Sequence, residues 1–247
     1  MKILASDFDG TLNYGGIDDR KRKAIARWQQ AGNLFGLVSG RDLSDLVSIT
    51  RNERVECDFF IANNGAVIAD ADGVIQNKIC CTDEIAERLI DRLFAAGCPL
   101  VRVCPSPGLI HSTAEVCAAG ESTWETMPPI PHFTQISTIC ANTADAVTLK
   151  DMVEACFGDY VDPLVNGPCL DIVPIGVDKA QGLYRLAEMY HVSPDAVIAV
   201  GDASNDTAMI TAFRSYAMQN GESVILKLAN AVTPGVPELI KLELGNE

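Results

Sequence analysis

The stretch Asp7-Phe8-Asp9-Gly10-Thr11-Leu12 decides the fold of this chain, and it directly follows a short apolar run at residues 2–6. An apolar run that ends in acids and a glycine is typical of a buried strand leading into a sharp polar turn. Two neighbouring carboxylates disfavour each other's ionisation unless a cation lies between them, and Mg²⁺ is the hard ion that such oxygen ligands suit. A bare D-x-D also fits a helix N-cap or a solvated turn. The preceding strand and the following Gly-Thr favour the metal site.

Short apolar runs alternate with amphipathic segments near both ends of the chain. This alternation is typical of a parallel sheet covered by helices on both faces, so we expect an α/β fold with a doubly wound, Rossmann-like sheet. Ligands of such sheets bind beyond the carboxyl ends of the strands, where the polar turns of this chain fall. The expected strands are residues 2–6, 33–38, 58–62, 196–200 and 215–218, and the expected helices are residues 18–31, 42–50, 178–190, 204–212 and 222–229.

The middle of the chain has a different pattern. Helices are expected at residues 83–96 and 145–157, and between them lie prolines and short extended runs, among them 101–104, 105–109, 127–133 and 135–141. Strands and helices in this order predict an α+β unit inserted into the first domain. We therefore expect a discontinuous core at residues 1–82 and 177–247 and an inserted domain at residues 83–176.

Two further segments carry groups that suit phosphate chemistry. Val38-Ser39-Gly40-Arg41 follows the second expected strand, where a hydroxyl and backbone N–H groups near a helix start can bind phosphate oxygens. Ser-Gly turns are also common without any ligand. Arg41 fits either a contact with the substrate or a structural ion pair, and we favour the ion pair. Lys179 stands at the start of an expected helix, where a lone lysine is usually solvated.

The last polar segment is Gly201-Asp202-Ala203-Ser204-Asn205-Asp206, and it follows the apolar run at residues 196–200. Its position predicts a second group of acids at the carboxyl edge of the same sheet. The alternative is a loop whose acids cap the next helix.

These segments together resemble the haloacid dehalogenase (HAD) superfamily, most of whose members are phosphatases. Residues 7–12 are similar to its first motif, Ser39 and Lys179 stand at its second and third, and residues 201–206 match the last, G-D-x-x-N-D. The stretches Asn63-Asn64-Gly65-Ala66 and Ala217-Met218-Gln219-Asn220 resemble the Cof-type branch of the sugar-phosphatase kind. That branch carries a large α/β cap after the third strand, which implies that residues 83–176 form a cap domain.

The resemblance implies a role for each matching residue. Asp7 would attack phosphorus, and Asp9 would protonate the leaving oxygen and then deprotonate the attacking water, with its side chain not itself bound to the metal. The expected catalytic residues are Asp7, Asp9, Ser39 and Lys179; the expected phosphate-binding residues are Gly10, Ser39, Gly40, Lys179 and Asn205; Asp7, Asp9 and Asp202 are expected at the Mg²⁺ ion, with Asn205 and Asp206 orienting the groups around it.

The function implied is a Mg²⁺-dependent phosphatase that hydrolyses a small phosphomonoester, a sugar phosphate, through a phospho-aspartate at Asp7. A phosphomutase of the same superfamily, which returns the phosphoryl group to another hydroxyl, is one alternative. A catalytically silent binding protein on the same fold is another, and the presence of all the charged site residues argues against it. Cap residues proposed to read the leaving group are Arg102, His111, His132 and Gln135, whereas His191 fits a structural role.

Composition restricts the partners. The net charge of −14 disfavours nucleic acids and anionic membranes, so a small phosphorylated metabolite is the expected partner. No apolar run is long enough for a bilayer, and the N-terminus lacks a signal-peptide pattern, which predicts a cytoplasmic protein. The nine cysteines show no C-x-x-C spacing and are expected to be reduced and mostly buried, without a zinc site. The oligomeric state, monomer or homodimer, stays open.

Overall fold

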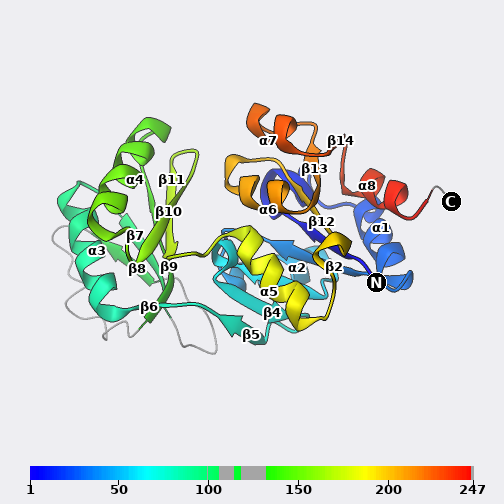
Figure 1. Ribbon diagram of the computed structural model, residues 1–247, viewed down its shortest axis with the longest axis horizontal. Helices are drawn as coiled ribbons and strands as arrows, with labels where there is room; N and C mark the ends of the chain where they lie inside the picture. The colour runs from blue at the N-terminus through cyan, green and yellow to red at the C-terminus, as the bar shows by residue number, and fades with distance from the viewer. Residues whose placement is uncertain (99, 106–113, 118–131, 246–247) are drawn as a thin grey trace. The chain divides into compact units, whose positions relative to one another are not determined.

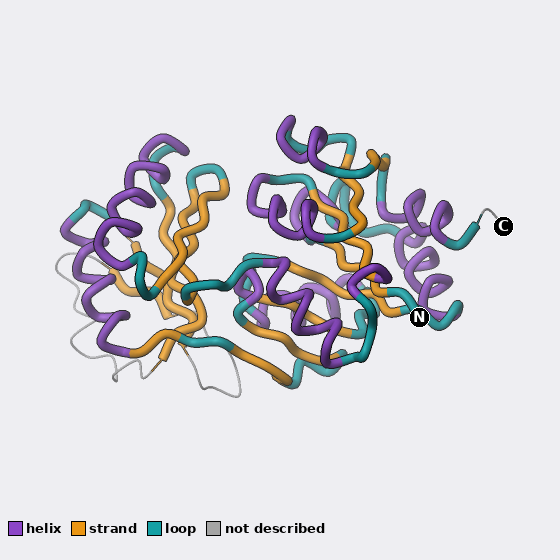
Figure 2. The backbone as a smooth tube through the Cα atoms, viewed as in Figure 1, coloured by secondary structure: helices purple, strands orange, loops and turns teal. Residues whose placement is uncertain are grey.

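The computed structural model describes residues 1–98, 100–105, 114–117 and 132–245. The chain forms two compact units. The first joins Met1–Asn77 to Asp178–Glu247, and the second comprises Lys78–Val177. Figure 2 shows that the strands of each unit gather into one sheet of their own.

The first unit is built on a sheet whose strands from β14 to β3 all run parallel. Strand β1 is central, pairs with β12 on one side and β2 on the other, and is buried along its whole length, because helices cover both faces. The strand order is β14 (Ala231–Thr233), β13 (Arg214–Met218), β12 (Val197–Gly201), β1 (Ile3–Ser6), β2 (Leu34–Val38), β3 (Phe59–Ala62), β4 (Val67–Asp70) and β5 (Ile75–Lys78). This arrangement confirms the doubly wound α/β class (Figure 1).

The helices of the first unit begin where the sequence offers caps. Asp18, Asp42 and Asp178 each accept a hydrogen bond from the backbone N–H three residues ahead, which satisfies a donor that the helix itself leaves free. Helix α5 packs on β1, β3 and β12 through Ala180, Leu183, Leu186 and Ala187. The helices are α1 (Asp19–Gln30), α2 (Leu43–Glu53), α5 (Lys179–Met189), α6 (Thr207–Ala212), α7 (Ser223–Leu228) and α8 (Val236–Glu243).

The end of the chain forms a helix that has a proline near its start. No helix or strand was predicted for residues 233–247, and α8 forms there with Pro237 in its first turn. A proline at that position loses no hydrogen bond, because the first N–H groups of a helix have no intrahelical partner. The short strand β14 precedes it.

The second unit is an antiparallel sheet with two helices, α3 (Asp83–Ala95) and α4 (Thr143–Phe157). Apolar side chains of both helices pack with strand residues such as Val101 and Ile136 into one core. The expected runs 105–109 and 127–133 lie largely outside the described residues. The strand order is β10 (Val161–Asn166), β11 (Cys169–Pro174), β9 (His132–Ile139), β7 (Leu100–Pro105) and β8 (Ala114–Cys117), with β6 (Cys81–Thr82) also paired to β9.

The buried face of α5 should carry much of the stability of the first unit. We expect Leu186→Ala to lower the free energy of unfolding by about 2–5 kcal/mol, because it removes fully buried methyl groups and leaves a cavity. Leu242→Ala is the matched control: its side chain is 56% exposed on α8, and a change below about 0.5 kcal/mol is expected. Denaturant unfolding of both variants measures the difference. Equal losses would contradict the packing described for α5.

Candidate active site

The candidate site lies at the carboxyl edge of the parallel strands. Asp7 follows β1, Ser39 follows β2, and Asp202 follows β12, so the parallel topology brings all three to one edge of the sheet. The backbone N–H of Asp7 donates to the carbonyl of Val200 at 2.9 Å and extends the pairing of β1 with β12. This contact fixes where the Asp7 side chain leaves the sheet.

The side chain of Lys179 connects two of these acids. Its Nζ donates to Asp7 Oδ1 at 2.8 Å and to Asp206 Oδ1 at 2.5 Å, and the residue is only 1% exposed. Burial by itself would lower the pKa of Lys179, but the charges of Asp206 and Asp7 outweigh it and hold the pKa above its ordinary value. Lys179 is therefore a fixed positive charge beside Asp7.

Both carboxylate oxygens of Asp206 accept hydrogen bonds from the protein. It is fully buried, and its Oδ2 accepts the backbone N–H groups of Asp202 at 2.9 Å and Ala203 at 3.1 Å. One of its oxygens thus holds the loop after β12 and the other holds Lys179. The role of Asp206 in orienting the groups around the ion stays a prediction.

Asp202 packs closely against the turn after β1. Its Oδ1 accepts a hydrogen bond from the hydroxyl of Thr11 at 2.6 Å. Gly10 has a φ of +80°, and a Cβ there would lie 2.2 Å from Asp202 Oδ2, so only glycine permits this approach. The Asn220 side chain donates to the Gly10 carbonyl at 3.0 Å. The sequence reading assigned no role to Thr11, although it lies within the first motif.

Three carboxylates meet at this point: those of Asp7, Asp202 and Asp206 each place one oxygen within 4.8 Å of the others. Within the described parts of the chain, Lys179 and Thr11 each donate to Oδ1 of their acid, which leaves Oδ2 of Asp7 and of Asp202 for a cation. One buried ammonium does not balance three carboxylates. The donor set of hard oxygens and its excess negative charge fit a divalent cation such as Mg²⁺.

The pKa of Asp7 reflects its burial and, to a smaller degree, the charges around it. Burial is the main cause and raises the pKa of Asp7 to about 8; Lys179 lowers it in part, whereas Asp206 and Asp202 raise it further. Burial likewise raises the pKa of Asp202. A cation beside both groups would stabilise their ionised forms.

The Asp9 side chain lies apart from this cluster; it was not expected to bind the ion directly, and a place for Asp9 at the metal stays a prediction. Arg41 holds it through two bonds, from Nε to Oδ2 at 2.6 Å and from Nη2 to Oδ1 at 2.9 Å. The guanidinium also lies over the Phe8 ring, 5.6 Å from its centroid. Arg41 thus forms the ion pair that the sequence reading favoured, and the carboxylates gathered in the structure are those of Asp7, Asp202 and Asp206.

Ser39 is buried in the loop after β2. Its hydroxyl accepts the backbone N–H of Arg41 at 3.2 Å, and its carbonyl accepts that of Asn64 at 3.0 Å. Gly40 lies between Ser39 and Arg41 in the same loop. Asn205 lies half-buried in the turn Ser204–Asp206. Phosphate binding by Ser39, Gly40 and Asn205 stays a prediction.

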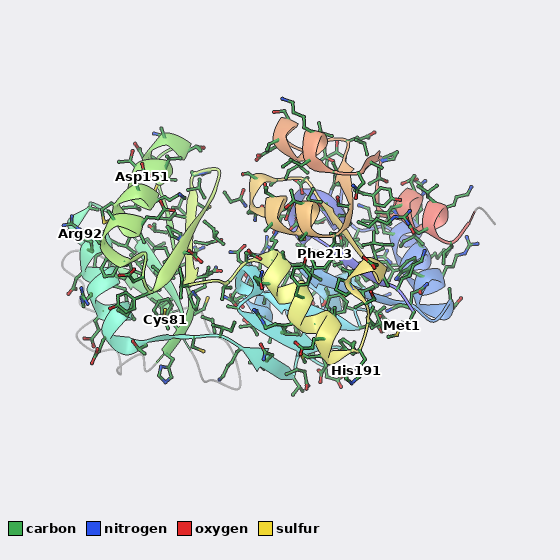
Figure 3. The ribbon with its side chains drawn as sticks, viewed as in Figure 1. Met1, Cys81, Arg92, Asp151, His191 and Phe213 are labelled. Atoms are coloured by element: carbon green, nitrogen blue, oxygen red, sulfur yellow. The ribbon has the colours of Figure 1, made fainter. Side chains whose placement is uncertain are left out.

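The other candidates divide between the two units. In the second unit Arg102 on β7 is in register with Ser137 on β9, and Gln135 donates to Ser137 Oγ at 3.1 Å. His132 is exposed at the start of β9, and His111 lies outside the described residues. In the first unit His191 is exposed after the end of α5 with a φ of +54° (Figure 3), which fits a helix-terminating position.

Two further sequence expectations concern the whole chain. The cysteines for which the structure gives a state are all free thiols, and Cys57, Cys81, Cys98 and Cys104 are buried. In the described part of the chain no helix is both long and apolar enough to cross a bilayer.

Known proteins resemble this chain over nearly its full length. A phosphoglycolate phosphatase from Halorubrum lacusprofundi is 26% identical over 93% of this chain and 89% of its own. A 5-amino-6-(5-phospho-D-ribitylamino)uracil phosphatase from Escherichia coli is 22% identical over the same shares. Among solved structures, a haloacid dehalogenase-like hydrolase from B. subtilis aligns with a TM-score of 0.83 at 21% identity, covering 98% of this chain and 99% of its own.

A HAD/COF-like hydrolase from Plasmodium vivax aligns equally well, with a TM-score of 0.83 at 18% identity over 100% of this chain and 96% of its own. The model of the haloacid dehalogenase-like hydrolase family matches residues 4–238. The resemblance inferred from the motifs is thereby confirmed. The chain belongs to the haloacid dehalogenase-like hydrolase family.

Proposed function

We propose that this protein is a Mg²⁺-dependent phosphatase that hydrolyses a small phosphomonoester through a phospho-aspartate at Asp7. The observation that carries the proposal is the buried Lys179 ammonium, bonded to Asp7 at 2.8 Å, beside the converging carboxylates of Asp202 and Asp206. The relatives named above are phosphatases, which supports hydrolysis over transfer to a second hydroxyl. The chain is accordingly a phosphoric monoester hydrolase.

The reaction divides into two displacements at phosphorus. A carboxylate oxygen of Asp7 forms a bond to phosphorus while the bond to the ester oxygen breaks, and the leaving oxygen takes a proton from Asp9. Water then attacks the phospho-aspartate as Asp9 accepts its proton, releasing phosphate and restoring Asp7. When bound by Asp7 and Asp202, Mg²⁺ would offset the repulsion between the Asp7 carboxylate and the anionic phosphate.

Other residues of the first unit would hold the phosphoryl group. Lys179 neutralises part of the charge that gathers on the phosphoryl oxygens, and its two hydrogen bonds keep it in place throughout the reaction. The hydroxyl of Ser39 and the backbone N–H of Gly40 are donors for the same oxygens. Arg41 orients the Asp9 carboxylate through two hydrogen bonds, from Nε to Oδ2 and from Nη2 to Oδ1.

The substrate class is proposed from the relatives. The substrate named for the Escherichia coli relative carries its phosphate on a ribityl chain, which supports a sugar phosphate or a similar polyol phosphate. We assign the reading of the leaving group to residues 83–176 as a cap domain, with Arg102 and Gln135 as its first candidates. Both lie with Ser137 on the β7–β9 pair. The cytoplasmic location and the absence of a nucleic acid partner remain predictions from composition.

We expect Asp7→Asn to reduce phosphate release from an aryl phosphate by at least roughly a thousandfold, because the amide cannot act as the nucleophile. Asp151→Asn is the matched control, since this acid is exposed on α4 (Figure 3), and its activity should equal that of the unchanged protein. A phosphate-release assay on both variants decides the point. Substantial activity in Asp7→Asn would exclude Asp7 as the nucleophile.

Removal of divalent cations should stop turnover. We expect a chelator to abolish phosphate release and added Mg²⁺ to restore it. Asp202→Asn should raise the Mg²⁺ concentration for half-maximal activity by about tenfold or more, because an amide oxygen carries no charge for the ion. A chelated enzyme with full activity would contradict the role given to Asp202.

The stability of the ion-free protein should fall as the pH rises. The pKa of Asp7 is raised to about 8 in the folded protein, so its proton stabilises the fold at low pH, and this contribution is lost as the pH rises to about 8. Mg²⁺ binds the ionised form, and we expect it to raise the Tm more at about pH 8.5 than at about pH 6. Thermal unfolding with and without Mg²⁺ measures both effects. Asp7→Asn should weaken the pH dependence, and an unchanged dependence would place its origin elsewhere.

A further inference from the structure

The turn Asn63–Gly65 lies at the carboxyl end of β3, and the mechanism above gives it no role. All three of its residues have a positive φ, 52° at Asn63, 52° at Asn64 and 108° at Gly65. Such conformations are costly for residues other than glycine and persist only where the surrounding contacts enforce them. The contacts on the two sides of the turn therefore indicate its purpose.

On one side the turn is bonded to the loop that contains Ser39. The N–H of Asn63 donates to the carbonyl of Arg41 at 2.9 Å, and the N–H of Asn64 donates to that of Ser39 at 3.0 Å. The N–H of Ser39 in turn donates to the carbonyl of Ile61 at 2.9 Å. Asn63 and Asn64 are also fully buried, so this side of the turn has little freedom to move.

On the other side the turn lies against the beginning of α5. A Cβ at Gly65 would lie 2.1 Å from the carbonyl oxygen of Asp178 and 3.4 Å from the backbone nitrogen of Lys179. A Cβ at Gly182, one turn further along α5, would lie 3.0 Å from the Cα of Gly65. The Arg185 guanidinium donates to the Gly65 carbonyl. Backbone meets backbone here, and there is no room for a methyl group.

We infer that Gly65 is a positioning residue for Lys179, a role that rests on the function proposed above. Because the turn is held by the loop after β2, a side chain at position 65 displaces the first turn of α5 rather than the turn itself. Lys179 is the first residue of that helix, and its Nζ sits between two carboxylates at 2.8 and 2.5 Å. A shift of the helix start moves this ammonium away from Asp7.

The first test is Gly65→Ala, assayed for phosphate release from an aryl phosphate. A displacement of about 1 Å at a charged group of the site is expected to lower kcat roughly a hundredfold. Gly32→Ala is the matched control, because Gly32 also has a positive φ, +79°, but has no atom within 4 Å of an added Cβ. It also places an alanine at a positive φ, but without the clash, and its kcat should stay within about twofold. Equal kcat values for the two variants would overturn the inference.

A double-mutant cycle separates positioning of Lys179 from general damage. In a Lys179→Met background Gly65→Ala should change kcat by less than about twofold, because the group through which it acts is gone. A full additional loss in that background would show that Gly65 acts by another route. Should Gly65→Ala fail to fold, Gly182→Ala replaces it, since it presses on the same contact from the helix, with a Cβ 3.0 Å from the Gly65 Cα and 2.8 Å from the Cγ2 methyl of Ile61. Its kcat should also fall, and unchanged activity would overturn the inference.

A structural measurement keeps this inference distinct from the proposed function. In a crystal structure of Gly65→Ala, we expect Lys179 Nζ to lie beyond hydrogen-bond distance of Asp7 Oδ1, that is, beyond about 3.5 Å. An unchanged position of Lys179 in Gly65→Ala would refute the positioning role even if the kcat of the variant has fallen. If the unchanged protein releases no phosphate from any phosphomonoester, the proposed function fails, and this distance still tests the role of Gly65.

Discussion

A buried ammonium group, that of Lys179, is the interaction on which the rest of this structure depends. It donates one hydrogen bond to Asp7, 172 positions away along the chain, and one to Asp206, 27 positions away. A buried charge that loses a partner costs about 3–5 kcal/mol, so the three groups stabilise one another only when β1, α5 and the loop after β12 come together. The same pairing leaves Asp7 beside a positive charge with one carboxylate oxygen facing Asp202. Stability of the core and reactivity of Asp7 therefore arise from one contact.

The backbone around this contact is shaped to permit close approach. Gly10 allows Asp202 to lie against the turn after β1, Gly201 leaves room for Asp206, and Gly65 allows the start of α5 to approach β3. In each case an added Cβ would lie within 2.5 Å of a neighbouring atom. The parallel sheet brings the strand ends to one edge, and these glycines let the connecting loops close over it. The geometry of the site therefore depends on several loops together.

The sequence predicted the parts of this arrangement that local patterns encode. The apolar runs before Asp7 and Asp202 identified both strands, and the resemblance of the motifs identified Lys179. The contact between Arg41 and Asp9 spans 32 positions and depends on the pairing of β1 with β2, which no local pattern specifies. The bonds of Asp206 to Lys179 and to the loop after β12 depend in the same way on contacts between distant segments, and the place of Asp9 at the metal stays a prediction. The close contact at Gly65 could not be predicted from the sequence either, because it depends on how closely the start of α5, at Asp178, approaches a turn 113 positions earlier.

The central claim is that Asp7 carries the phosphoryl group during turnover. The most direct measurement is acid quenching of the enzyme during hydrolysis of a phosphomonoester, followed by peptide mapping at acidic pH, where acyl phosphates survive. We expect one phosphorylated peptide that includes Asp7, with fragmentation assigning the group to that residue, and no such peptide from Asp7→Asn. Turnover without a phosphorylated peptide, or with the phosphoryl group on another residue, would contradict the account.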